Sequence, residues 1–397
     1  MNRSRREIRR YVVCCLAAVS IGWVFQVTSF VVNHDGLPLR MLRLGSHQAE
    51  IAGISRVNAT GKVVILDGDG FDGQFFYFLG GDPLVRGGGA VLGAPHLRAR
   101  RIGLAWIGLA LGLGEDGRAV GLLVAQSLSL LALIALFQHL AFREEISPWL
   151  CVAIPLLLPV LMPLEFVTAE LVAGALVIGA LVTAANERPG RAAFLVGAAC
   201  LCKEICVLVV AALMIEKIVL RQWRRVLAYS FSVVPLLAWI VYLGVVLPVA
   251  SDPGDSLQNI DWPFAGLGLA SLADFSDLLS GVEPQRAAGN LAARVWYFAV
   301  ALVALPMSLR KQPTAARILL GFSALLALVL SAGGPAFAYD FIFNFARQLF
   351  LLPLAAVAVL FLEWKTLSGG ERVGLQVWLW VGAALGLAWA VQQIFFP

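Results

Sequence analysis

The segment DGDGFDGQFFYFLGGDP, residues 67–83, places several carboxylates and glycines directly before a run of aromatic residues. A carboxylate can act as a general base that takes a proton from an attacking hydroxyl group, or it can ligate a divalent cation. A calcium-binding EF-hand needs glycine at its sixth position and glutamate at its twelfth, and Asp72 and Phe78 stand there instead. General-base chemistry and the capping of a helix that begins near Asp72 are the two interpretations left open.

Basic residues suited to a phosphate group occur far apart in the chain. Arginine binds phosphate through two parallel hydrogen bonds, and lysine acts as a point charge. The candidates are Arg100, Arg101, Lys203 and Arg347. Lys203 and its neighbour Glu204 stand between two apolar runs, where a charge costs about 2.5–3.5 kcal/mol at a helix centre. A functional role and simple mutual pairing both account for them.

The composition is that of a membrane protein. Charged residues make up 14% of the 397 residues and hydrophobic residues 60%, and the mean hydropathy is +0.83. Soluble domains carry about 25% charged residues. Backbone groups in lipid must satisfy their own hydrogen bonds, so the recurring apolar runs predict an all-α polytopic fold. The net charge of +5 lies largely in short clusters between these runs, which excludes a nucleic-acid footprint.

The positive-inside rule sets the threading. We expect a first, uncleaved span over 11–32 with a cytoplasmic N-terminus, then a long outer loop over 33–118. Within that loop, 102–113 is too short to span and fits a membrane-parallel helix. The inner loops of this threading, FREEISP, NERPGR, RQWRR, SLRKQP and EWKTLSGGER, all carry Arg or Lys. The sequence thus predicts one domain over 1–397 with about eleven spans and a second outer loop over 248–293.

Four sequence elements resemble landmarks of the bacterial GT-C type integral-membrane glycosyltransferases, which are similar to protein O-mannosyltransferases and aminoarabinose transferases. FDGQFFYFLGGDP is similar to the family's YDGQFYY…DP motif. The others are LRARRIGLAWIGLALGLG, ACLCKEI and FARQLFLLP, at 97–114, 199–205 and 345–353. The family's usual proline after the Arg-Arg-Ile element is absent, because GLAW stands at 103–106.

The resemblance implies a GT-C-like bundle that transfers a sugar, with inversion, from a polyprenyl-phosphate donor on the outer face of the bacterial cytoplasmic membrane. The acceptor would be a lipid-linked or surface glycan, a lipid or a protein of the cell envelope. Asp72 is the expected catalytic base, and Asp69 is its alternative. No metal or other cofactor is expected, although clustered aspartates could hold Mg²⁺. The residues expected to bind substrate are Asp69, Gln74, Tyr77, Arg100, Arg101, Glu165, Lys203, Glu204 and Arg347.

Several of these residues also fit a purely structural role. Tyr77 could be an interfacial anchor, and Glu165, like Glu170, could cap the fourth span instead of orienting an acceptor. Asp82 is expected to begin a turn with Pro83. For the whole chain, the alternatives are a transporter or flippase of a lipid-linked glycan and a non-catalytic factor for cell-surface polymer assembly. A transporter would place paired charges at mid-membrane in both halves, whereas here the charges gather in the predicted outer segments.

Overall fold

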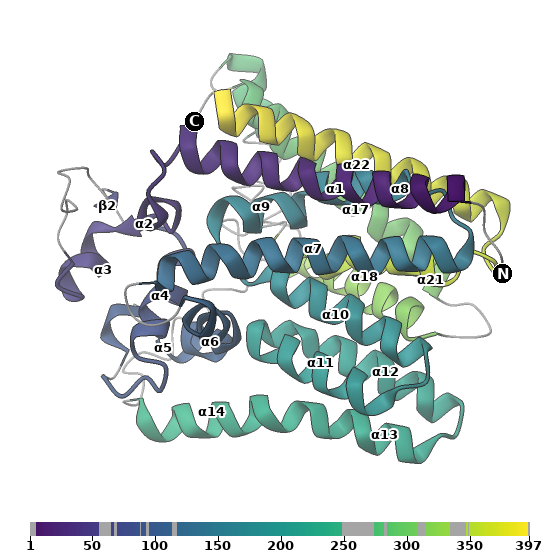
Figure 1. Cartoon of the computed structure of the whole chain (residues 1–397), viewed down its shortest axis with the longest axis horizontal. Helices are drawn as coiled ribbons and strands as arrows, with labels where there is room; N and C mark the ends of the chain where they lie inside the picture. The colour runs from purple at the N-terminus through teal and green to yellow at the C-terminus, as the bar shows by residue number, and fades with distance from the viewer. Residues whose placement is uncertain are drawn as a thin grey trace.

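The computed structural model describes residues 5–54, 65–66, 70–87, 89–92, 95–112, 117–247, 274–281, 284–308, 314–333, 347 and 349–395. In these residues the chain forms an all-α fold, apart from a parallel pair of two-residue strands (Figure 1). The strands are β1 (Leu44–Gly45) and β2 (Ile65–Leu66). The predicted helical class is confirmed for the described part of the chain.

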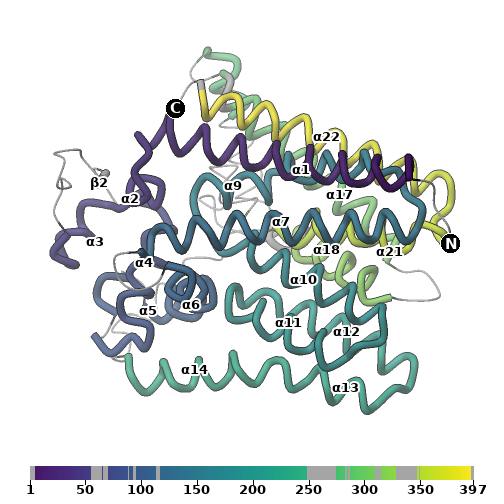
Figure 2. The backbone as a smooth tube through the Cα atoms, in the orientation of Figure 1, coloured from purple at the N-terminus to yellow at the C-terminus, as the bar shows by residue number. Residues whose placement is uncertain are grey.

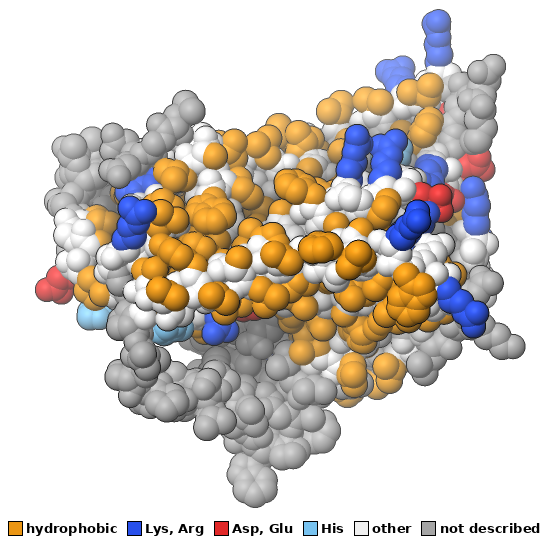
Figure 3. All heavy atoms as spheres, turned by 90° about the horizontal axis from the view of Figure 1, so that it is seen from below, with side chains coloured by type: hydrophobic (Ala, Val, Ile, Leu, Met, Phe, Trp, Pro, Cys, Tyr) orange, Lys and Arg blue, Asp and Glu red, His pale blue; other side chains and the backbone are white. Residues whose placement is uncertain are grey.

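Five helical segments are long and apolar enough to cross a membrane. They lie in α1 (Arg5–Val32), α7 (Arg118–Glu144), α13 to α14 (Trp223–Ser230 and Val234–Val246), α17 (Pro284–Ser308) and α22 (Gly369–Phe395). On α14, Val241 and Val245 are 68% and 80% exposed. Hydrophobic side chains cover much of the face in Figure 3, and Lys and Arg side chains gather toward one end. Such a band fits contact with lipid.

Shorter apolar helices complete the bundle. They are α10 (Glu170–Ala185), α11 (Pro189–Cys202), α12 (Val207–Val219), α18 (Ala315–Gly333) and α21 (Leu351–Leu362). Residues 351–361 of α21 are all buried, and α10 is buried along nearly its whole length. A helix that is apolar on every side packs against protein on every side, which explains why α10 and α21 lack a polar face.

Residues 150–166 form a broken helix. The threading expects a third span over about 149–161, and the structure shows that this segment is helical but interrupted. The segment consists of α8 (Leu150–Ala153), a 3₁₀ turn (Ile154–Leu156) and α9 (Leu158–Phe166). Pro155 and Pro159 cause the interruption, because proline lacks the N–H that a continuing helix would donate.

Three of the predicted inner loops, FREEISP, NERPGR and EWKTLSGGER, meet at one end of the bundle. Glu144, at the end of α7, pairs with Lys365 at 3.3 Å, and its neighbour Arg143 donates to Asn186 Oδ1 at 2.5 Å. At the same end, Tyr11 near the start of α1 donates to the Ile146 carbonyl at 2.9 Å. Figures 1 and 2 show the start of α1 and the end of α22 at opposite ends of the bundle. This grouping agrees with the predicted threading.

The opposite end carries short elements that position the candidate site. They are α2 (Pro38–Met41), α3 (Ser46–Ile51), α4 (Gly73–Gly81), η1 (Ala90–Leu92), α5 (Pro95–Arg98), η2 (Ala99–Arg101) and α6 (Ile102–Leu111). In Figure 1, α6 is seen end-on while α1, α7 and α14 run across the view. Helix α6 therefore lies across the bundle direction, as predicted for 102–113.

Candidate functional site

The loop before α4 holds Asp72 in place through backbone contacts. The N–H of Phe71 donates to the Arg43 carbonyl at 3.0 Å, and Gly70 forms an antiparallel bridge with Leu44. Gly70 has a φ of +68°, and a Cβ there would lie 2.4 Å from the Arg43 carbonyl oxygen. Only glycine fits this conformation and this close approach, so the position of Asp72 depends on it.

Gly70→Ala is therefore expected to destabilise the protein by about 1–2 kcal/mol or more, the cost of a left-handed conformation for a residue with a Cβ. A melting temperature lowered by several degrees in detergent would be the measured result. Gly190→Ala is the matched control, because nothing lies within 4 Å of a Cβ at that position. Equal melting temperatures for the two variants would contradict the backbone argument.

Gly73 and Gln74 fix the start of α4. A Cβ on Gly73 would lie 2.7 Å from the Phe166 carbonyl oxygen. Gln74 is 0% exposed, and its Oε1 accepts a hydrogen bond from the Gly45 N–H at 2.8 Å. This burial and the backbone hydrogen bond give Gln74 a structural role in the loop, and its contact with a sugar stays a prediction. The Gly-Gln pair holds the aspartate before it in position.

The side chain of Asp72 does not cap α4, so the capping interpretation is wrong. Its Oδ2 instead lies 2.5 Å from Arg347 Nη2 and 3.8 Å from Arg101 Nη1. The carboxylate is 26% exposed. The structure thus brings the predicted base together with two of the predicted cations, and Arg347 is 275 residues away in sequence.

A second carboxylate lies behind Arg347. Glu170 Oε1 accepts a hydrogen bond from Arg347 Nε at 2.9 Å and also pairs with Lys203. Lys203 Nζ donates in addition to the Arg347 carbonyl at 3.1 Å. The side chains of Glu170 and Lys203 are only 1% and 7% exposed. Mutual pairing therefore keeps both charges in a buried position, where an unpaired charge would be costly.

Arg101 joins these residues to the end of α11. Its Nη2 and Nε lie 2.9 Å and 3.0 Å from the two carboxylate oxygens of Glu204, a bidentate arrangement. The connected set is called the Asp72 cluster below. Its members are Asp72, Arg101, Glu170, Lys203, Glu204 and Arg347.

The cations of the cluster keep Asp72 ionised. Burial alone would raise the pKa of the Asp72 carboxyl, but the charge and hydrogen bond of Arg347 and the charge of Arg101 outweigh it and hold the pKa below its ordinary value. Asp72 is therefore an unprotonated carboxylate at neutral pH. It has the protonation state that a general base needs, and Arg347 and Arg101 stabilise its negative charge.

Two further arginines, Arg98 and Arg100, shortly precede Arg101 in the chain. The Arg98 guanidinium carbon lies 3.7 Å from the centroid of the Phe75 ring, and Arg98 donates to the Leu92 carbonyl. Arg100 is half-buried and, among the residues that the structure describes, forms no ion pair. Arg100 directly precedes Arg101 in the chain, and the described residues do not neutralise its charge.

Glu165 belongs to a separate buried group and not to the cluster. It is 0% exposed, bonds to Ser29, and lies 3.3 Å from His34 Nε2 and 2.9 Å from Arg43 Nη2. This position argues against the predicted acceptor contact, and Glu170, not Glu165, begins α10. Through Arg43, whose carbonyl holds Phe71, Glu165 supports the loop that carries Asp72.

Sequence analysis does not single out Arg43, although this residue supports the loop that carries Asp72. Its guanidinium carbon lies 4.5 Å from the Phe166 ring centroid and 5.1 Å from that of Phe71, and the two rings stack at 5.0 Å. Arg43 and Glu165 are separated by 122 residues. No sequence motif links the two residues. In the sequence, each is simply a charged residue near the end of a predicted span.

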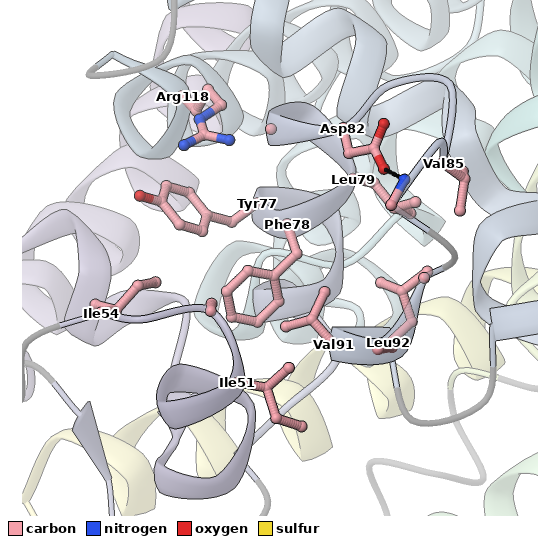
Figure 4. Close-up of a pocket in the computed structure, with 15 residues that line it drawn as sticks. Ile51, Ile54, Tyr77, Phe78, Leu79, Asp82, Val85, Val91, Leu92 and Arg118 are labelled. Atoms are coloured by element: carbon pink, nitrogen blue, oxygen red, sulfur yellow. Dashed lines mark hydrogen bonds between the residues drawn. The ribbon is translucent and has the colours of Figure 1, made fainter.

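Tyr77 lies in the wall of a pocket of about 430 Å³ on α4 (Figure 4). The Arg118 guanidinium carbon lies 4.6 Å from the Tyr77 ring centroid. A Cβ on Gly81 would lie 1.9 Å from Arg118 Nη1, so this glycine lets Arg118 pack over the helix. Phe78 and Leu92 supply apolar wall. None of the cluster residues lines this pocket.

The other acidic residues of the segment behave differently. Asp82 accepts hydrogen bonds from the N–H groups of Arg86 and Gly87 at 3.0 Å and 2.7 Å, the turn role predicted for it. Asp69, the alternative base, lies outside the described residues. Within the described ranges, no three His, Cys, Asp or Glu side chains form a group that could hold a metal ion.

Comparisons of this chain with models of known protein families, with curated proteins and with solved structures find no match. The assignment of a reaction therefore depends on the geometry of the Asp72 cluster and on the sequence motifs.

Proposed function

We propose that the protein is a GT-C type glycosyltransferase that moves a sugar from a polyprenyl-phosphate donor to a cell-envelope acceptor, with inversion at the anomeric carbon. The observation that carries the proposal is the contact of a partly exposed, ionised Asp72 with Arg347 and Arg101. A base and phosphate-binding cations are the two components that such a transfer requires in one place.

The reaction divides these roles between the residues. Asp72 takes the proton of the acceptor hydroxyl as its oxygen attacks the anomeric carbon. The bond from that carbon to the phosphate oxygen breaks, and the departing phosphate carries negative charge. Arg347, Arg101 and Lys203 stabilise that charge, because cations already oriented toward the departing group need little reorganisation during the reaction.

The membrane arrangement of this proposal has eleven spans. The long helices supply α1, α7, α13 to α14, α17 and α22, and the remaining spans are the broken helix 150–166 and the shorter α10, α11, α12, α18 and α21. The end with Arg143 and Lys365 faces the cytoplasm by the positive-inside rule. The Asp72 cluster then lies at the outer face of a bacterial cytoplasmic membrane.

Purified protein incubated with a panel of polyprenyl-phosphate sugars and an envelope lipid extract tests the proposal. Transfer of sugar from one donor, with release of polyprenyl phosphate, is the expected result. Movement of a lipid-linked glycan across proteoliposomes without a new glycosidic bond would support a transporter instead. Absence of both activities with every donor would overturn the proposed function.

Arg100 provides a further prediction for donor binding. Arg100→Ala is expected to raise the KM for the donor about tenfold, since a hydrogen bond to a charged group contributes about 1.5–3 kcal/mol. The kcat should change little, because the residue lies beside the cluster and not within it. Lys365→Ala is the control, since that side chain is 62% exposed at the other end of the bundle. Similar KM values for both variants would contradict a phosphate role for Arg100.

A further inference from the structure

Arg347 bonds to two carboxylates in different surroundings. Its Nη2 contacts Asp72 at 2.5 Å, and its Nε contacts Glu170 at 2.9 Å. The Glu170 side chain is 1% exposed and also pairs with Lys203, whereas the Asp72 side chain is 26% exposed. Glu170 is thus the permanent inner partner of Arg347, and Asp72 is the partner that a ligand from outside can reach.

The six members of the Asp72 cluster carry equal numbers of negative and positive charges. Asp72, Glu170 and Glu204 supply three negative charges, and Arg101, Lys203 and Arg347 supply three positive charges. An entering phosphate adds negative charge and needs the donors of Arg347 and Arg101. Glu204 holds Arg101 by two short contacts, whereas Asp72 lies 3.8 Å from it, so Asp72 holds Arg101 less strongly than Glu204 does.

We propose that the phosphate of the donor displaces Asp72 from Arg347 and Arg101, so that the carboxylate becomes available as a base only when the donor is bound. This inference depends on the proposed function. In the transfer that follows, the acceptor oxygen bonds to the anomeric carbon, the bond from that carbon to phosphate breaks, and the acceptor proton goes to Asp72. Polyprenyl phosphate leaves, and the proton passes to water.

The exchange explains why a base is paired with arginine at all. A carboxylate held by two cations accepts a proton poorly, and the same two cations keep the pKa of Asp72 low. When their donors turn to phosphate, Asp72 loses that stabilisation and accepts a proton more readily. An attacking hydroxyl is therefore activated in the presence of its sugar donor and not in the empty site.

Binding of a short-chain polyprenyl phosphate, which carries no sugar, tests the exchange without any transfer. Asp72→Asn is expected to bind it about 3- to 10-fold more tightly than the wild type, because a competing, partly exposed ion pair has been removed. The same comparison is made with inorganic phosphate. If Asp72→Asn increases the affinity for inorganic phosphate much less than the affinity for polyprenyl phosphate, the site is assigned to lipid phosphate.

Asp35→Asn is the matched control, because it removes the same charge from an exposed pair with Arg40 near the outer end of α1. Its affinity should equal that of the wild type. Asp72→Ala repeats the measurement with a second variant that lacks the carboxylate. Unchanged or weaker binding by both Asp72 variants would overturn the exchange while leaving the proposed function intact. A wild type that binds no polyprenyl phosphate would overturn both.

Discussion

Replacing Asp72 with asparagine is expected to lower the rate of sugar transfer by a factor of about 10²–10⁴, the usual contribution of a general base. Asparagine has nearly the same shape but cannot take the proton of the acceptor hydroxyl. The protein should stay folded, because the Asp72 side chain does not cap α4 and the loop is held through the backbone of Phe71 and Gly70.

The decisive measurement is kcat in a transfer assay with saturating donor, together with the melting temperature of each variant. Asp82→Asn is a useful second comparison, because that aspartate bonds only to the turn after α4 in the described contacts. Its kcat should stay within a few-fold of the wild-type value. A kcat for Asp72→Asn near that of the wild type, in a protein of normal stability, would remove Asp72 as the base.

The grouping of distant charged residues could be predicted from the sequence. The positive-inside rule places the segments around Asp72, Lys203 and Arg347 at one end of the bundle, and the structure brings all three together. Topology determines at which end of the bundle a loop residue lies, because each span carries the chain from one end to the other. It does not fix which side chains touch, so the position of Glu170 between Lys203 and Arg347 could not be foreseen.

The roles of Gln74 and Glu165 could not be predicted from their sequence environment. Both are polar residues beside Asp72 or in a predicted outer turn, and both are fully buried. Burial depends on tertiary partners such as the Gly45 N–H and Arg43, which are distant in sequence. A motif indicates that such residues matter, but not whether they contact a substrate or hold the residue that does.

Some helix boundaries could also be predicted from the sequence, and others could not. The apolar run of 102–113 predicts a short helix, and α6, Ile102–Leu111, confirms a helix there. Its length of ten residues is short for a span. The break within 150–166 follows from several prolines, whose local effect is readable in principle. Short buried spans such as α21 are harder to delimit, since an all-round apolar helix gives no periodic signal.

Arg347→Ala is expected to produce the other large effect, a fall in kcat/KM for the donor of about 10²–10³, as found when a transition-state hydrogen-bond donor is removed. The substitution also leaves the buried Glu170 with Lys203 as its remaining charged partner in the described contacts, so a lower melting temperature should accompany it. Arg347→Lys should keep part of the stability but little of the activity, because a lysine cannot contact Asp72 and Glu170 from two sides of one planar group.

The combination of Asp72→Asn with Arg347→Ala connects this effect to the exchange of partners. If Asp72 competes with phosphate for Arg347, its removal tightens binding of polyprenyl phosphate only while Arg347 is present. In the Arg347→Ala background, the gain from Asp72→Asn should therefore shrink to the small part that Arg101 supplies across 3.8 Å. A double-mutant cycle measures that coupling directly. Equal gains in both backgrounds would mean that Asp72 repels phosphate through its charge alone, because a general repulsion does not depend on which cation it faces.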